Sequence, residues 1–82
     1  MNSSNINTIT DETVIGKSVK YYDYLGFERF GKIVAIEPYV HPIYWIYIED
    51  SDPDFNFYED VVNGKVVSYG EIRPSDEVYI DE

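Results

Sequence analysis

The side chains best suited to chemistry are carboxylates crowded into one short stretch of the chain. Six of them lie between residues 49 and 60, in the order Glu49, Asp50, Asp52, Asp54, Glu59 and Asp60. Phe57 and Tyr58 stand among them. Carboxylates held on a rigid scaffold attract a positive groove on another protein, and aromatic rings supply the contact area that charge alone does not. We therefore predict that these eight residues form a partner-binding surface, with the two rings as its anchors.

The same stretch lacks the spacing of a metal or catalytic site. Asp50, Asp52 and Asp54 match the first three ligand positions of an EF-hand loop, but the sixth position holds Phe55 instead of Gly and the twelfth holds Val61 instead of Glu. The chain has no Cys, one His and five dispersed Gly. These counts exclude thiolate chemistry, a His-rich metal cluster and a phosphate-binding loop. We predict no catalytic residue, no metal and no cofactor.

Aromatic residues offer a second candidate site. Nine Tyr among 82 residues are more than the core of so small a domain is expected to hold, so some rings should line a surface. This alternative aromatic site consists of Tyr22, Tyr24, Trp45 and Tyr47. Strand alternation places Tyr44, Ile46 and Ile48 on the face opposite Trp45 and Tyr47. We favour the first face as core, although the pattern leaves the choice open.

The excess of negative over positive charge lies in the second half of the chain. Residues 1–36 carry four basic and four acidic side chains, whereas residues 37–82 carry two basic and twelve acidic ones. The net charge of −10 repels polyphosphate, so we predict no direct binding of nucleic acid. Two interpretations of this charge stay open. It attracts a basic partner, or it only keeps a small protein in solution.

The elements that must position these residues are expected to be strands. Apolar residues alternate with a period of two over residues 14–22, 29–37, 43–49, 55–62, 65–69 and 78–80. Asn63-Gly64 is a strong hairpin signal, and a 3₁₀ turn fits residues 74–77. We predict an all-β barrel of five to six strands over residues 13–82, closed because open edges invite aggregation, after a flexible tail at residues 1–12.

Three segments carry a family resemblance. They are I-G-K-S-V-K-Y-Y from Ile15, F-G-K-I-V-A-I from Phe30, and I-R-P-S-D-E-V from Ile72. This pattern resembles an SH3-like small barrel of the Tudor or KOW type, which implies a 3₁₀ turn before the last strand. The Tudor resemblance also implies an aromatic cage for a methylated cation. Such barrels bind many classes of ligand, so the resemblance carries no activity.

Two main hypotheses for function follow. In the first, the protein is a non-enzymatic inhibitor that occludes a basic, nucleic-acid-binding groove on a nuclease or similar effector by charge mimicry. Its small, acidic, Tyr-rich and Cys-free composition resembles that of phage anti-defence inhibitors and toxin-immunity proteins. In the second, it is a Tudor- or SH3-like peptide-binding module or accessory subunit that uses the aromatic face. A third possibility is an accessory protein whose acidity serves solubility alone.

The hydropathy pattern argues against a membrane. The longest uncharged apolar stretch, residues 38–48, is shorter than the roughly 20 residues that span a bilayer. No basic segment followed by an apolar one opens the chain, so we predict no signal peptide and a cytoplasmic location. The sequence leaves the oligomeric state open.

Overall fold

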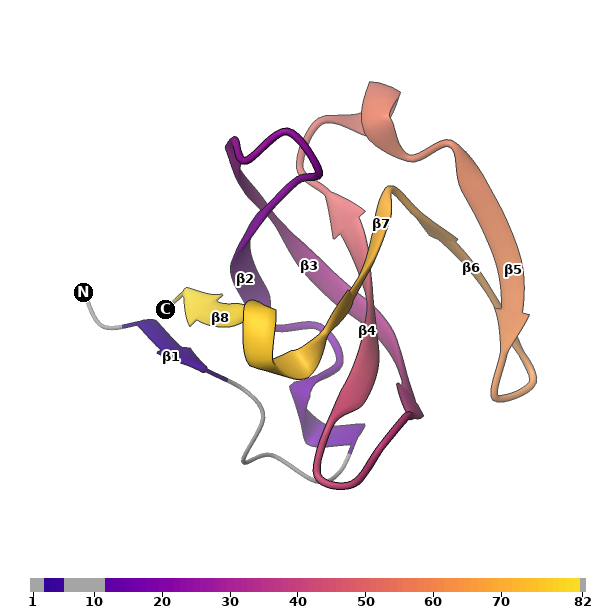
Figure 1. Ribbon diagram of the computed structural model, residues 1–82. Coiled ribbons are helices and arrows are strands. Elements are labelled where there is room, and N and C mark those ends of the chain that lie inside the picture. The colour runs from indigo at the N-terminus through magenta and orange to yellow at the C-terminus, as the bar shows by residue number, and fades with distance from the viewer. Residues whose placement is uncertain (1–2, 6–11, 82) are drawn as a thin grey trace.

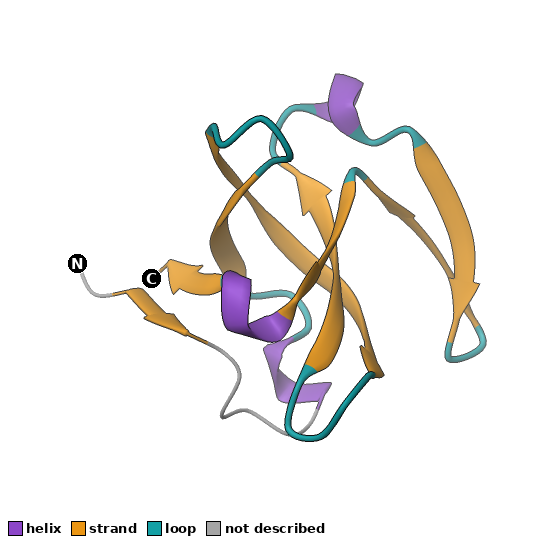
Figure 2. Ribbon diagram, viewed as in Figure 1, coloured by secondary structure: helices purple, strands orange, loops and turns teal. Residues whose placement is uncertain are grey.

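The chain folds into antiparallel strands joined by short turns. The computed structural model describes residues 3–5 and 12–81 (Figure 1). The strands are β1 (Ser3–Asn5), β2 (Ser18–Tyr22), β3 (Glu28–Pro38), β4 (Tyr44–Asp50), β5 (Tyr58–Val62), β6 (Lys65–Tyr69), β7 (Glu71–Pro74) and β8 (Tyr79–Asp81). Within the described residues the helical segments are single 3₁₀ turns, coloured purple in Figure 2: η2 (Glu12–Val14), η3 (Pro53–Phe55) and η4 (Ser75–Glu77). The predicted all-β class is confirmed.

The main sheet is curled but not closed. Its six strands follow the order β1-β8-β2-β3-β4-β7. β2 pairs with β8 only through Val19 and Lys20, and β7 pairs with β4. Between β2 and β7 the Nε of Arg73 donates a hydrogen bond of 3.2 Å to the carbonyl of Tyr22. The prediction of closure was therefore wrong. The edge strands β1 and β7 are short, and the Arg73 side chain bridges the open side between β7 and β2.

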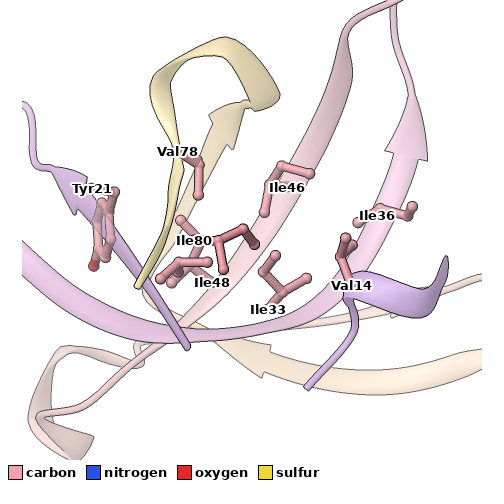
Figure 3. Packing of buried hydrophobic residues seen from close by; sticks show 9 residues of the cluster. Val14, Tyr21, Ile33, Ile36, Ile46, Ile48, Val78 and Ile80 are labelled. Carbon is pink, nitrogen blue, oxygen red and sulfur yellow. The ribbon is translucent and has the colours of Figure 1, made fainter. Parts of the chain in front are cut away.

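The first hydrophobic core lies inside the curled sheet. Its buried side chains are Val14, Val19, Tyr21, Ile33, Ile36, Ile46, Ile48, Val78 and Ile80, which Figure 3 shows packed together. Tyr44 packs against this cluster while remaining partly exposed. The face of β4 that was favoured as core is thus confirmed.

A second core covers the other face of β3 and β4. Hairpin β5–β6 forms a separate two-stranded sheet, and Val62 and Tyr69 from it pack against Ala35 and Tyr47. The Tyr47 and Tyr69 rings meet edge to face, with centroids 5.0 Å apart. The hydroxyl of Tyr47 donates to Glu37. Tyr47 is only 8 % exposed, which corrects its assignment to an accessible aromatic site, because both faces of β4 are buried.

Two glycines matter for this arrangement. Asn63 and Gly64 have φ values of 52° and 80°, as a type I′ turn requires, so the predicted hairpin is confirmed. Gly31 lies opposite Asp50 in the β3–β4 ladder. A Cβ at Gly31 would lie 2.4 Å from the carbonyl oxygen of Glu49, so only Gly permits this close approach of β3 to β4.

The amino-terminal segment contributes β1. Ser3–Asn5 pairs antiparallel with β8, with Ser3 opposite Asp81. Residues 1–2 and 6–11, which make up most of the predicted tail, lie outside the described residues.

Candidate partner-binding surface

Asp50 is an internal counter-ion. Its carboxylate accepts hydrogen bonds from Nε and Nη2 of Arg29 at 3.0 and 2.9 Å, and from the hydroxyl of Tyr21 at 2.5 Å. The side chain lies at the end of β4, and the residue is 4 % exposed. Burial alone would raise the pKa of Asp50, but the hydrogen bonds from Arg29 and Tyr21 outweigh it and hold the pKa below its ordinary value. Asp50 is therefore bonded inside the domain, and its predicted contact with a partner stays a prediction that this burial disfavours.

Asp50 also shapes the acidic turn that follows it. Its backbone N–H donates to Oδ1 of Asn56 at 2.7 Å, and Nδ2 of Asn56 donates to the Asp50 carbonyl at 3.1 Å. The Asp52 N–H donates to the Asp50 carboxylate at 2.9 Å. Asp52 then caps η3 by accepting the Asp54 N–H at 3.0 Å, with Pro53 at the first position of the turn. These local bonds fix the backbone of the η3 turn, on which Asp52 and Asp54 are exposed.

Arg29 extends this network to the aromatic residues. Its guanidinium carbon lies 3.8 Å from the centroid of the Phe55 ring, which places a cation over the ring face. Because the same guanidinium binds Asp50, the Phe55 ring is tied to β3 and β4 through one side chain. Phe55 and Phe57 meet edge to face at 6.3 Å, and Phe57 meets Tyr58 in the same manner at 6.4 Å.

An open cleft of about 420 Å³ lies between the β2–β3 turn and the segment that runs from η3 into β5. Its walls carry exposed rings and one exposed aliphatic side chain: Tyr24, Leu25, Phe55, Phe57 and Tyr58. Tyr24 is 82 % exposed and Phe57 is 73 % exposed. The structure thus brings Tyr24, from the alternative aromatic site, into the same cleft as Phe57 and Tyr58. We call this feature the aromatic cleft.

Two carboxylates in the aromatic cleft were missed by the sequence analysis. Oδ1 of Asp23 accepts the N–H groups of Leu25 and Phe27, each at 2.9 Å, and so shapes the β2–β3 turn. Glu71 is half-buried, and its carboxylate lies 3.2 Å from Nη2 of Arg73. Burial raises the pKa of Glu71, and the nearby Asp23 and Asp50 raise it further. Asp23 stands before the turn signal at Gly26, but nothing in the sequence links Glu71 to that turn.

The remaining predicted residues lie around the hairpin and the sheet. Asp52, Asp54 and Glu59 are exposed, whereas the exposed Asp60 accepts a hydrogen bond from the Tyr69 hydroxyl. Glu49 is half-buried in β4 and pairs across the ladder with Lys32, outside the aromatic cleft. The predicted carboxylates therefore divide between the η3 turn and the β4–β5 strands.

The alternative aromatic site does not form one surface. Tyr22 is partly exposed on β2, where Nζ of Lys20 lies 6.0 Å from its ring centroid. Trp45 is half-buried and packs against Tyr39, with ring centroids 4.5 Å apart. Only Tyr24 of the four lines the aromatic cleft.

A second acidic group lies elsewhere. Asp76 and Glu77 are exposed on η4, the yellow turn before β8, which Figure 1 places far from η3. This group supplies a matched control for any experiment on the η3 turn.

Over residues 3–5 and 12–81 no cluster of three or more His, Cys, Asp or Glu is arranged to hold a metal ion. In the same part of the chain no helix is long and apolar enough to cross a membrane.

Comparisons with known proteins gave no relative. No protein-family model, no curated protein and no solved structure matches the chain. The function of the protein is therefore inferred from the geometry and charge of the chain itself.

Proposed function

We propose that this protein is a non-enzymatic inhibitor that binds a partner protein through the aromatic cleft and the adjoining η3 turn. The partner presents a basic surface that otherwise binds nucleic acid, and the inhibitor occludes it. One observation carries this proposal: the exposed Tyr24, Phe57 and Tyr58 line one cleft. The η3 turn, which contributes Phe55 to that cleft, carries exposed carboxylates on a backbone that bonds to the buried Asp50. Exposed rings next to exposed charges are the composition of a protein-binding hot spot with an electrostatic rim.

Charge supports the choice of partner. The chain carries a net charge of −10, and Asp50 is neutralised internally by Arg29. Asp52, Asp54 and Glu59 are exposed on the same segment of chain as the cleft's rings at residues 55, 57 and 58. Such a surface speeds the association with a positive patch and repels polyphosphate. A basic protein surface that binds nucleic acid is complementary to it. We place this interaction in the cytoplasm, where such effectors act.

The strand arrangement supports a more specific assignment within the all-β class. We propose an SH3-like barrel of the Tudor or KOW type, because the 3₁₀ turn η4 directly precedes the last strand, β8, as that resemblance implies. The β5–β6 hairpin and its second core add to this frame, and they supply one wall of the aromatic cleft.

A peptide-binding module remains the second candidate. The exposure of Tyr24 and the volume of the aromatic cleft favour it, since a groove of this size accepts one or two side chains of an extended peptide. Such a module uses the aromatic cleft rather than the four-residue aromatic face, because Tyr47 is buried and Trp45 packs on Tyr39.

Competition with nucleic acid tests the inhibitor proposal. The immobilised protein is used to capture a partner from a lysate of the cells that make it, and the purified partner is then bound to labelled duplex DNA or RNA. We expect the inhibitor to displace the nucleic acid at low salt and to lose affinity as salt screens the charges.

Two outcomes contradict the proposal. One is a partner that binds nucleic acid and this protein at the same time. The other is an affinity that does not change with ionic strength, which instead favours the peptide-binding module.

A further inference from the structure

The outer edge of β5 has unpaired backbone groups. β5 pairs with β6 alone, and Val62 lies opposite Lys65 across the two-residue turn. In such a hairpin the residues that flank the turn form a hydrogen-bonded pair, and bonded pairs alternate along the ladder. The bonded residues of β5 are therefore Val62, Asp60 and Tyr58. The N–H and C=O groups of Glu59 and Val61 point away from β6.

This edge is accessible. Val61 is 68 % exposed, and Tyr58 through Val61 are all exposed, with Val62 the one buried residue of the strand. Figure 1 shows β5 on the outer flank of the molecule, with β6 between it and β7. Within the described residues no other strand pairs with β5.

The side chains on this edge select the kind of strand that can pair with it. Glu59 and Asp60 put negative charge on both faces of β5, and Asp60 already accepts a hydrogen bond from the Tyr69 hydroxyl. Like charges that face each other across two strands are destabilising, so these carboxylates oppose pairing with a second copy of this acidic chain. The same carboxylates favour a strand that carries Lys or Arg.

We propose that an extended basic segment of the partner adds to β5 as a further strand. Its backbone bonds to the N–H and C=O groups of Glu59 and Val61, and a Lys or Arg lies opposite Glu59 with its aliphatic stem on Val61. The inference that the partner is basic rests on the proposed function, whereas the inference that it docks by strand addition does not.

A pair of synthetic peptides tests strand addition on the intact protein. The first is a decapeptide of alternating Lys and Thr, whose Thr residues favour strands. The second is the same peptide with every backbone amide N-methylated, which keeps the charge and removes the N–H donors of a strand. We expect the first peptide to slow the hydrogen exchange of the Glu59 and Val61 amides, and the second to leave them unchanged. Equal effects of both peptides, or no effect of either at millimolar concentration, would overturn the inference.

A variant of the edge separates this inference from the proposed function. Val61→Pro removes the outward N–H of Val61 without removing a bond of the β5–β6 ladder, and Val61→Thr is the matched control that keeps it. We expect about tenfold weaker binding of the Lys–Thr peptide for Val61→Pro and unchanged binding for Val61→Thr. The Val62 amide, bonded within the hairpin, reports whether the hairpin remains folded.

The combined results have distinct meanings. If Asp52→Lys with Asp54→Lys weakens the binding of the partner but Val61→Pro does not, strand addition is wrong and the proposed function stands. If neither change has an effect, both are wrong. A dimer of the protein that Val61→Pro abolishes would assign this edge to a second copy and overturn the inference.

Discussion

Asp50→Ala is expected to destabilise the domain by about 3 kcal/mol or more, because it leaves a partly buried guanidinium without its counter-ion. Arg29 loses both hydrogen bonds to the carboxylate, and the buried Tyr21 hydroxyl loses its acceptor. Folded domains are stable by only about 5–15 kcal/mol, so the change removes a large part of the total. Urea denaturation followed by tyrosine and tryptophan fluorescence measures the loss.

Asp54→Ala is the control for this prediction. Asp54 is exposed at η3, and its side chain is not part of the Asp50 network, so its removal is expected to cost less than about 0.5 kcal/mol. Equal stability of the two variants would show that Asp50 is not the internal counter-ion described above.

The pH dependence of stability is a second test of Asp50 as the internal counter-ion. The pKa of Asp50 is lower in the folded chain than in the unfolded chain, so its ionised form stabilises the fold fully above the unfolded value. That stabilisation is lost as the pH falls through the folded value. We expect the free energy of unfolding to decline below about pH 4, and to decline less in Asp50→Ala. Glu71 acts in the opposite direction, because burial raises its pKa.

The second large effect is expected in partner binding. Asp52→Lys together with Asp54→Lys should weaken the binding of the captured partner about tenfold to a hundredfold at low salt, and should reduce the dependence of the affinity on salt. Both side chains are exposed on the η3 turn, which contributes Phe55 to the aromatic cleft, so their reversal opposes a positive surface that docks there. Titration calorimetry at several salt concentrations measures both effects.

The matched control reverses the same amount of charge at another place. Asp76→Lys together with Glu77→Lys alters the exposed η4 turn and leaves the aromatic cleft unchanged. We expect this pair to weaken binding only slightly. A loss equal to that of the η3 pair would mean that net charge, rather than a particular surface, governs the affinity.

Much of the fold could be predicted from local patterns. The Asn63-Gly64 turn and the buried face of β4 follow from residue preferences and alternation, which act over a few residues. The strand predicted over residues 55–62 begins only at Tyr58, because Asp52 and Pro53 start a 3₁₀ turn in its place.

The candidate site was harder to predict because its decisive contacts are long-range. Asp50 looked like any other member of an acidic run, yet the β3–β4 register brings it to Arg29 and buries it. Strand alternation predicted that Tyr47 is exposed, but the β5–β6 hairpin packs against that face of β4 and buries it. Asp23 and Glu71 are far apart in the sequence but both line the aromatic cleft, and no spacing in the sequence predicts that proximity.

Hydrogen exchange of the complex tests the central claim most directly, because it maps the partner onto this protein residue by residue. If the aromatic cleft and the η3 turn bind the partner, the amides of residues 23–27, 52 and 54–58 exchange more slowly in the complex than in the free protein. Protection confined to η4 and β8, with those two segments unchanged, would contradict the account.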